Sequence, residues 1–294
     1  HQYLSSVQSV AKLLKELEVD DYKILTALST PTPHHKLLTR EQLAYSAKLH
    51  RDKTDFIIGR LKGFKLVTVT LDGVGLVMAG LDAIALKTFV DNNIITGLGM
   101  SIGGGKESDV FEAITANGQT RAIKFFRIGR ISFRQVRKKR SYVDNIHSGN
   151  WILTNVQAAQ TEYSILQKLQ HTGMAIPKPY YRRLHTIVMS RIKGENLVEA
   201  KDIQNPKQIL FDILHEVRLA YDLNIINCDL SEYNIMVDVD NRPWIIDWPQ
   251  AVTQAHPNAA RLIRRDVSNV VNFFKRRFHV ELNGSEALKL VLSN

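Results

Sequence analysis

The chain has 294 residues and a formal net charge of +10, with 44% hydrophobic and 23% charged residues, which excludes a disordered or fibrous chain and suggests two globular domains. No stretch approaches the roughly 18 consecutive apolar residues of a membrane span, and the N-terminus has no basic-then-apolar signal, so we expect a cytoplasmic protein without membrane contact. The single cysteine, Cys228, excludes a disulfide framework and a cysteine-based zinc site, while the positive charge suggests a polyanionic partner.

The first 80 residues predict a winged helix-turn-helix domain. Short apolar patterns indicate helices, and the third helix begins at a capping box formed by Thr39 and Gln42. A fourth helix is expected over 52–63, with Asp52 as its N-cap. The Asp72-Gly73 pair then separates two β-rich runs, which is a strong hairpin signal. Helices followed by a two-stranded wing are typical of this fold.

The fourth helix would be the recognition helix of such a domain. It carries Arg51, Lys53 and Arg60, and a helix of this kind binds nucleic acid through side chains that reach bases and phosphates. Winged helices also serve as protein-docking modules, so both roles stay open. We expect the winged helix at 1–80, a connecting helix at 81–95 and a second domain at 96–294.

A glycine-rich segment opens the second domain. Residues 101–111 read S-I-G-G-G-K-E-S-D-V-F, and glycines allow a backbone to approach phosphate oxygens closely. Met100 and Glu107 stand where a Walker A motif needs glycine and serine or threonine, so that motif is excluded. The spacing fits a kinase-type loop, although a flexible turn between strands is an alternative. The candidate phosphate contacts are Gly103, Gly105, Lys106 and Ser108.

A strand lysine and a helical glutamate extend this pattern. Lys124 lies in the alternating run 122–125, where a kinase keeps the lysine that contacts the phosphates of ATP. Glu162 opens a helix with an apolar face and would form the ion pair with Lys124. Each residue has an alternative interpretation when it is considered alone. Lys124 also fits an exposed strand lysine, and Glu162 also fits a surface glutamate in a first helical turn.

The strongest motif is N-C-D-L-S-E-Y-N at 227–234, followed by I-I-D-W at 245–248. An aspartate with an asparagine five residues later has the spacing of a kinase catalytic loop, and an aspartate after a strand is the metal-binding element. Kinases use one carboxylate to orient the nucleophile, and a carboxamide with a second carboxylate to hold Mg²⁺. The motif therefore predicts Asp229 as catalytic residue, with Asn234 and Asp247 as metal ligands joined by a hairpin.

Positive charge is concentrated in one segment. From 113 to 143 the chain has nine Lys and Arg residues and no Asp or Glu. Such an unbalanced run favours contact with phosphates, although a solvated loop is the alternative. Phe133 and Tyr142 would stack there on unpaired bases. The candidate RNA contacts in this segment are Arg134, Arg137, Lys138, Lys139 and Arg140.

Together these motifs resemble the RIO family of atypical protein kinases, in particular the branch with an N-terminal winged helix. The matching pieces are the wing, G-G-G-K-E-S-D-V-F, A-I-K, the basic segment, D-L-S-E-Y-N and I-D-W-P-Q. The resemblance implies an α+β fold with a compact bilobal kinase domain. It also implies ATP and Mg²⁺ as ligands, with Mn²⁺ as an alternative ion, and a role on small-subunit rRNA in pre-ribosomal particles.

The resemblance further implies where ATP lies. The N-lobe is expected at 96–189, a hinge at 189–192 and the C-lobe at 193–294. Backbone groups of Met189, Ser190 and Ile192 would meet adenine, and Asp247 would accept phosphate transiently. No A-P-E signature follows Gln250, so we expect ATP turnover as a conformational switch rather than peptide phosphorylation.

Two departures from the family pattern bear on activity. The usual His-Gly before the catalytic aspartate is Asn227-Cys228 here; because asparagine also donates and accepts hydrogen bonds, we expect altered rather than lost activity. The I-I-D-W run resembles small-molecule kinases of the aminoglycoside and choline type as much as the RIO pattern. A small-molecule phosphotransferase therefore stays open, as does a winged-helix nucleic-acid-binding regulator with a relic kinase domain.

Overall fold

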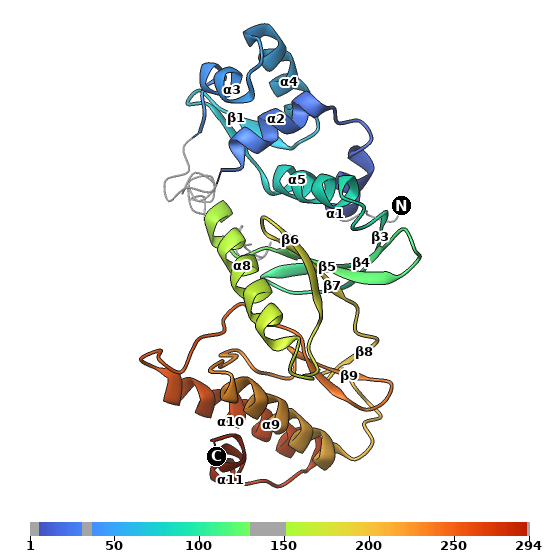
Figure 1. Ribbon diagram of the computed structural model, residues 1–294, viewed down its shortest axis with the longest axis vertical. Helices are drawn as coiled ribbons and strands as arrows, with labels where there is room; N and C mark the ends of the chain where they lie inside the picture. The colour runs from blue at the N-terminus through green and yellow to red at the C-terminus, as the bar shows by residue number, and fades with distance from the viewer. Residues whose placement is uncertain (1–5, 31–36, 130–150, 293–294) are drawn as a thin grey trace. The chain divides into compact units, whose positions relative to one another are not determined.

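The computed structural model describes residues 6–30, 37–129 and 151–292 (Figure 1). The chain forms two compact units, His1–Ala159 with Tyr181–Val188, and Gln160–Tyr180 with Met189–Asn294. The division falls inside one continuous helix, α8 (Trp151–Leu169). In the described ranges, every helix is too short or too polar to cross a membrane.

The first unit begins with helices and a wing. Its elements are α1 (Ser6–Leu13), α2 (Val19–Leu28), α3 (Arg40–Ala47), α4 (Arg51–Gly63), β1 (Val67–Val69), β2 (Val74–Leu76) and α5 (Met78–Asp91). The predicted capping box is confirmed, since the Gln42 N–H donates to Thr39 Oγ1 at 3.2 Å and the Thr39 N–H donates to Gln42 Oε1 at 2.9 Å. The N-cap of α4 is His50 rather than Asp52, because His50 Nδ1 accepts from the Asp52 N–H.

The wing turn lies one residue earlier than predicted. Val69 pairs with Val74, and the Thr70 N–H donates to the Gly73 carbonyl at 2.9 Å, so Leu71 and Asp72 form the tip. Gly73 has a φ of 144°, and a Cβ there would lie 2.8 Å from the Leu38 carbonyl oxygen. Glycine is therefore needed at position 73 because the segment before α3 passes close to it, and not because it forms the tip of the turn.

A five-stranded sheet follows in the order β3-β4-β5-β7-β6. Its strands are β3 (Gly97–Gly104), β4 (Ser108–Ile114), β5 (Thr120–Phe126), β6 (Pro179–Arg183) and β7 (Thr186–Ser190). Strands β4 and β5 pair without interruption, whereas β3 and β4 shift register twice between Leu98 and Gly103. The irregular pairing coincides with the glycine-rich segment, where side chains that would fix the register are missing.

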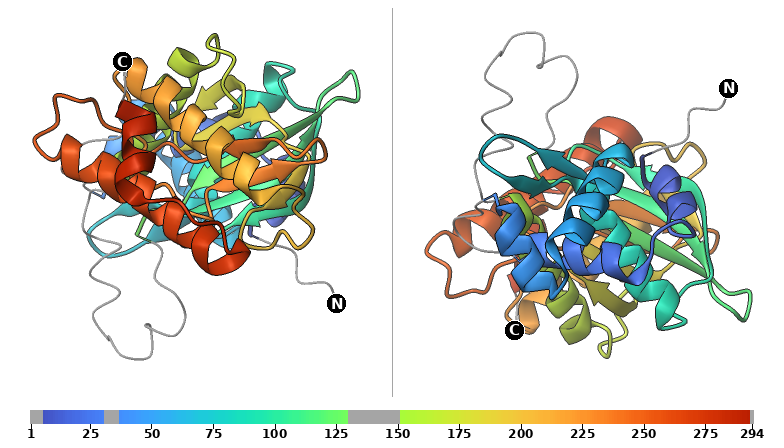
Figure 2. Two further views of the ribbon diagram at one scale, coloured as in Figure 1. Left: turned by 90° about the horizontal axis from the view of Figure 1, so that it is seen from below. Right: turned by 90° about the horizontal axis from the view of Figure 1, so that it is seen from above.

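The second unit combines the last part of α8 with a small sheet and a helical layer. Its further elements are β8 (Gly194–Asn196), α9 (Pro206–Asp222), β9 (Ile235–Asp238), β10 (Pro243–Ile245), α10 (Ala259–Phe278) and α11 (Gly284–Leu292). The strands form a sheet in the order β10-β9-β8. Helices α9, α10 and α11 pack against one another, as Figures 1 and 2 show.

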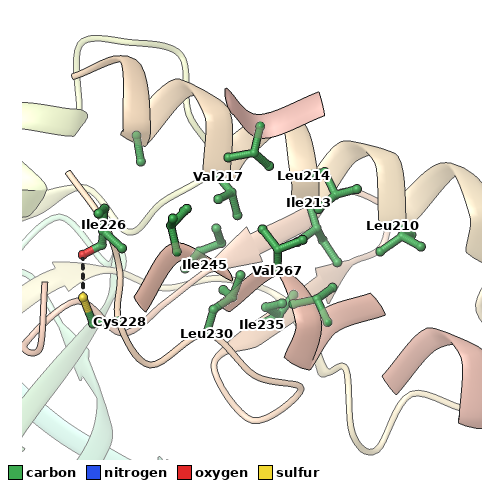
Figure 3. Close-up of a cluster of buried hydrophobic side chains, with 14 of the residues drawn as sticks. Leu210, Ile213, Leu214, Val217, Ile226, Cys228, Leu230, Ile235, Ile245 and Val267 are labelled. Atoms are coloured by element: carbon green, nitrogen blue, oxygen red, sulfur yellow. Dashed lines mark hydrogen bonds between the residues drawn. The ribbon is translucent and has the colours of Figure 1, made fainter. Parts of the chain in front are cut away.

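The core of the second unit lies between this sheet and the helices. Ile213 and Leu214 of α9 meet Ile235 and Ile245 of the hairpin and Val267 of α10 (Figure 3). The apolar positions of α10 belong to this cluster and form the buried face of the helix. The order of helices, wing and mixed kinase-like domain confirms the predicted α+β class.

Candidate active site

Asp229 and Asn234 lie on the loop between α9 and β9 in the second unit. The Asn234 amide nitrogen donates to the backbone carbonyl of Asp229 and, at 3.3 Å, to the Asp229 carboxylate. At the other end of the β9–β10 hairpin, the Ile246 N–H donates to the Asn234 carbonyl at 2.9 Å. The hairpin therefore brings Asp247, the next residue, beside Asp229 and Asn234.

Asn227 ties the two aspartates together through their backbones. Its amide nitrogen donates to the Asp247 carbonyl at 2.6 Å, and its Oδ1 accepts from the Asp229 N–H at 3.1 Å. The side chain is 6% exposed, so water competes little for these bonds. Asparagine thus uses both its donor and its acceptor at the position where the family pattern has histidine.

A buried carboxylate on α10 holds the same loop from behind. Asp266 accepts the N–H of Cys228 at 2.7 Å and the N–H of Leu230 at 3.3 Å, so its two oxygens fix the residues on both sides of Asp229. Burial raises the pKa of Asp266 to about 6, against the opposing effect of these two donors. Sequence reasoning missed this residue, although an aspartate on the apolar face of a helix was a usable signal.

The backbone of the loop is left-handed immediately before Asp229. Cys228 has a φ of 68°, in the region that favours glycine, which fits the glycine of the family pattern. Its thiol is buried and donates to the Ile226 carbonyl at 3.4 Å. Burial raises the pKa of the Cys228 thiol to about 11, so the group stays protonated near neutral pH.

Glu162 belongs to the middle of a helix rather than to its start. Helix α8 begins at Trp151, and Glu162 is completely buried, so the interpretation as a first-turn surface glutamate is wrong. Its Oε1 accepts the Trp248 N–H at 3.2 Å. Glu162 therefore contacts the residue that follows Asp247, a link within the second unit that the sequence did not indicate.

Lys124 is a buried strand lysine. It lies on β5 opposite Val110 of β4, is 3% exposed, and places its Nζ 4.8 Å from the centroid of the Phe126 ring. This burial excludes the alternative of an exposed strand lysine. A lysine is almost never fully buried without a partner. Lys124 lies in the first unit and Glu162 in the second, and their pairing stays a prediction.

The glycine-rich segment forms the turn of the β3–β4 hairpin. The Gly105 N–H donates to the Ser108 carbonyl at 2.9 Å and closes the turn. Gly103, Gly105 and Lys106 are exposed and Ser108 is half-buried. The backbone at this turn is thus accessible to a ligand, as a phosphate-covering loop requires.

In the predicted hinge, residues 189–192, part of the backbone is already hydrogen-bonded within the protein. The Ser190 N–H donates to the Lys178 carbonyl, and Ser190 Oγ accepts the Lys178 N–H, both at 2.8 Å. Of its two backbone groups, Ser190 therefore keeps only the carbonyl for adenine, while Met189 is 4% exposed. The backbone donor expected from this segment is then Ile192, which lies outside the strands.

The predicted RNA contacts divide into two groups. On α4, Arg51 pairs with Glu41 at 3.0 Å, while Lys53 pairs with Asp20 and Arg60 with Asp21. These ion pairs reduce the positive charge that the helix presents to a polyanion. The five cations of the basic segment fall outside the described residues.

The donor set near Asp229 fits magnesium better than a transition metal. Within the described ranges, no group of three or more His, Cys, Asp or Glu side chains is arranged to hold a metal ion. Asn234 and Asp247 together offer a carboxamide oxygen and a carboxylate. Mg²⁺ is commonly held by only one or two carboxylates together with water and substrate phosphates, so this pair is sufficient.

Comparisons with known proteins give matching results for the N-terminal part and the C-terminal part of the chain. A family model described as "RIO domain" matches residues 109–287, and one described as "Rio2, N-terminal" matches residues 14–92. The RIO-type serine/threonine-protein kinase Rio2 of Methanocaldococcus jannaschii is 32% identical over 83% of this chain and 92% of its own length. Serine/threonine-protein kinase rio2 of Dictyostelium discoideum is 31% identical over 91% of this chain and 52% of its own length.

A solved structure extends this similarity to the fold. The Rio2 kinase of Chaetomium thermophilum, crystallised as an ADP/Mg²⁺-phosphoaspartate complex, superposes with a TM-score of 0.84 at 28% sequence identity. The match covers 97% of this chain and 89% of the other. The similarity therefore includes both the N-terminal helices with their wing and the kinase-like domain.

Proposed function

The chain belongs to the RIO family of serine/threonine-protein kinases, in the Rio2 branch, and we propose that it turns over ATP with Mg²⁺ on precursor particles of the small ribosomal subunit. The observation that carries the ATP-dependent chemistry is the joint placement of Asp229, Asn234 and Asp247, held by Asn227. The net charge of +10 and the winged helix support a partner that contains RNA.

Each residue has a definite task in this proposal. Asp229 orients the nucleophile, while Asn234 and Asp247 hold the metal ion. When bound, Mg²⁺ neutralises charge that develops on the transferred phosphoryl group. Lys124 contacts the phosphates, and the glycine-rich turn covers them with backbone N–H groups.

Asp247 is also proposed as a transient phosphate acceptor. Its carboxylate attacks the γ-phosphorus, the bond to the β-phosphate oxygen breaks, and ADP leaves; water then releases inorganic phosphate and restores the carboxylate. The related Chaetomium protein was crystallised as a phosphoaspartate complex, which supports this order of events. A short-lived acyl phosphate suits a conformational switch better than peptide phosphorylation.

The experiment compares ATP turnover under three conditions. Phosphate release is measured with Mg²⁺ alone, with purified precursor small subunits, and with a mixture of aminoglycosides and choline. We expect turnover that responds to the particle and not to the small molecules. Phosphorylated aminoglycoside or choline would instead establish the small-molecule alternative, and binding to duplex DNA without any ATP turnover would establish the regulator.

A further inference from the structure

Helix α10 presents a continuous cationic stripe on the second unit. The helix has 20 residues, and its only acidic residue, Asp266, is completely buried. The exposed residues combine cations with neutral polar side chains. The stripe consists of Arg261, Arg264, Arg265, Ser268, Asn269, Asn272, Lys275 and Arg276.

The spacing of these residues places them on one face. They recur every three or four positions, which is the period of an α-helix, and from 261 to 276 they extend for about 22 Å at 1.5 Å per residue. The opposite face packs into the hydrophobic core through residues such as Leu262, Val270 and Phe274. The core therefore fixes the rotation of the helix and keeps the cations outside.

Among the residues that the structure describes, few carboxylates neutralise the charge of this stripe. Within the described part of the chain, Arg261, Arg264 and Arg276 form no ion pair, and Lys275 pairs with the exposed Glu281 at 3.3 Å. Arg265 donates to the Cys228 carbonyl, a neutral acceptor. The cations of α4 differ, since each of its three candidate contacts faces a carboxylate.

We infer that the exposed face of α10, defined by the stripe above, binds the phosphate backbone of structured RNA. A polyanion complements a row of unneutralised cations, and serine and asparagine side chains commonly donate to phosphates and sugars between them. A membrane-binding helix would need an exposed apolar face, and here that face is in the core. An acidic protein partner would be expected to use aromatic or aliphatic anchors, which this stripe lacks.

This inference rests on the proposed function and specifies where the RNA-containing partner is held. Because the stripe has no aromatic side chain to stack on bases, binding should depend on backbone geometry rather than on sequence. Arg265 and Asp266 are neighbours on α10 and both bind the loop around Asp229. RNA on this face would therefore lie next to residues that hold the catalytic loop.

The test removes three cations that do not touch the catalytic loop. The variant is Arg261→Gln/Arg264→Gln/Arg276→Gln, and the probe is a 20-base-pair RNA duplex titrated between 50 and 200 mM salt. The matched control, Lys168→Gln/Lys201→Gln/Lys207→Gln, makes the same charge change at exposed positions of the same unit. Circular dichroism and basal ATP turnover check that both variants are folded.

We expect the α10 variant to bind the duplex at least tenfold more weakly at 100 mM salt. The log–log salt slope should become shallower by about 2 to 3, since each lost contact removes about 0.7 to 0.9. The control should stay within twofold of the wild type. Equal weakening in both variants would show that net charge alone is responsible and would overturn the inference.

Three further results would each bear differently on this inference and on the proposed function. Wild-type binding to the duplex with no loss in the α10 variant would overturn the α10 site and leave the action on an RNA-containing particle intact. No wild-type binding to any RNA would overturn both. Polyglutamate that binds the wild type and loses affinity in the α10 variant, while RNA does not, would assign the face to an acidic protein.

Discussion

The two residues before Asp229, Asn227 and Cys228, differ from the family pattern and affect how the loop is held in place. Asn227 uses its donor and its acceptor on the two aspartate segments, and Cys228 adopts a left-handed backbone that costs about 1 kcal/mol for a residue other than glycine. Asp266 offsets this cost by accepting the N–H groups on either side of Asp229. The loop is therefore held by side chains that do not themselves meet the substrate.

We predict that Asn227→Ala lowers kcat for ATP turnover by about 10- to 100-fold, since two buried hydrogen bonds of about 1 kcal/mol each position both aspartates. The KM for ATP should change less than threefold, and Asn227→His should recover part of the rate. Steady-state kinetics checks this. The matched control is Asn92→Ala, which also removes a bond to a backbone carbonyl, at 2.7 Å, but lies at the end of α5 in the first unit. Similar rates for both alanine variants would contradict the positioning role.

Asp266 should make stability and activity respond to acid in opposite directions. Its folded pKa of about 6 lies above the unfolded value of 3.8, so the folded state binds the extra proton between these pH values. This group alone then makes the protein more stable as pH falls from 7 to 4, by about 2.4 kcal/mol. Protonation also removes an acceptor from the loop, so kcat should fall below about pH 6.

The measurement compares the wild type with Asp266→Asn in urea unfolding and in kcat from pH 4.5 to 8. The stability difference in favour of the wild type should grow as pH falls, and the acidic limb of kcat should disappear in the variant. Asp202→Asn, at an exposed position, controls for the loss of a carboxylate. A stability difference that does not vary with pH would contradict the raised pKa.

At the scale of elements, a buried ionic cluster fastens helix α5 to the sheet of the first unit. Arg127 binds the Asp82 carboxylate with two nitrogens, at 2.9 and 2.8 Å, and Asp109 with its Nε at 3.1 Å. His185 Nε2 lies 2.7 Å from Asp82. Burial lowers the pKa of His185, while Arg127 holds the pKa of Asp82 below its usual value against desolvation. Neutral histidine thus donates to an ionised aspartate.

Arg127→Met should destabilise the protein by about 3 to 5 kcal/mol, because it leaves the Asp82 carboxylate buried without its counter-charge. Urea unfolding followed by intrinsic fluorescence measures this loss. Arg121→Met, on strand β5, which ends just before Arg127, is half-buried and should cost less than about 1 kcal/mol. The double change Asp82→Asn/Arg127→Met should recover part of the loss, and equal stabilities for the two arginine variants would refute the cluster.

At the scale of the whole molecule, the machinery is divided between two units. The glycine-rich turn and Lys124 belong to the first unit, and Glu162, Asp229 and Asp247 belong to the second. Helix α8 is common to both, because the division falls within it. The residues for which we predict roles in ATP turnover therefore come from both units.

Replacing Asp247 and replacing Asp229 should have different effects on ATP binding and turnover. Asp247→Ala should abolish Mg²⁺-dependent turnover and weaken Mg·ATP binding, since a metal carboxylate is lost. Asp229→Ala should lower kcat by at least 100-fold while ATP affinity stays within about threefold, since its role lies in the transition state. Calorimetric titration and phosphate release measure these quantities. Turnover of Asp247→Ala within twofold of the wild type would contradict the assignment.

Much of this protein follows from local sequence. The capping box at Thr39 and the hairpin between Asn234 and Asp247 were both predicted, because each depends on spacing over a few residues. The loop spacing at 229–234 likewise indicated a kinase before any fold was known. Short-range periodicity and hydrogen bonding determine these features without contributions from distant parts of the chain.

Contacts between distant segments were decided only by the tertiary structure. The carboxylates that pair with the cations of α4, the hold of Asp266 on the catalytic loop, and the bond from Trp248 to Glu162 all join residues far apart in the chain. Whether a charge is neutralised depends on which other side chain folds beside it. Among the described residues, the same residue types are therefore paired on α4 and largely unpaired on α10, a difference that exists only in the folded chain.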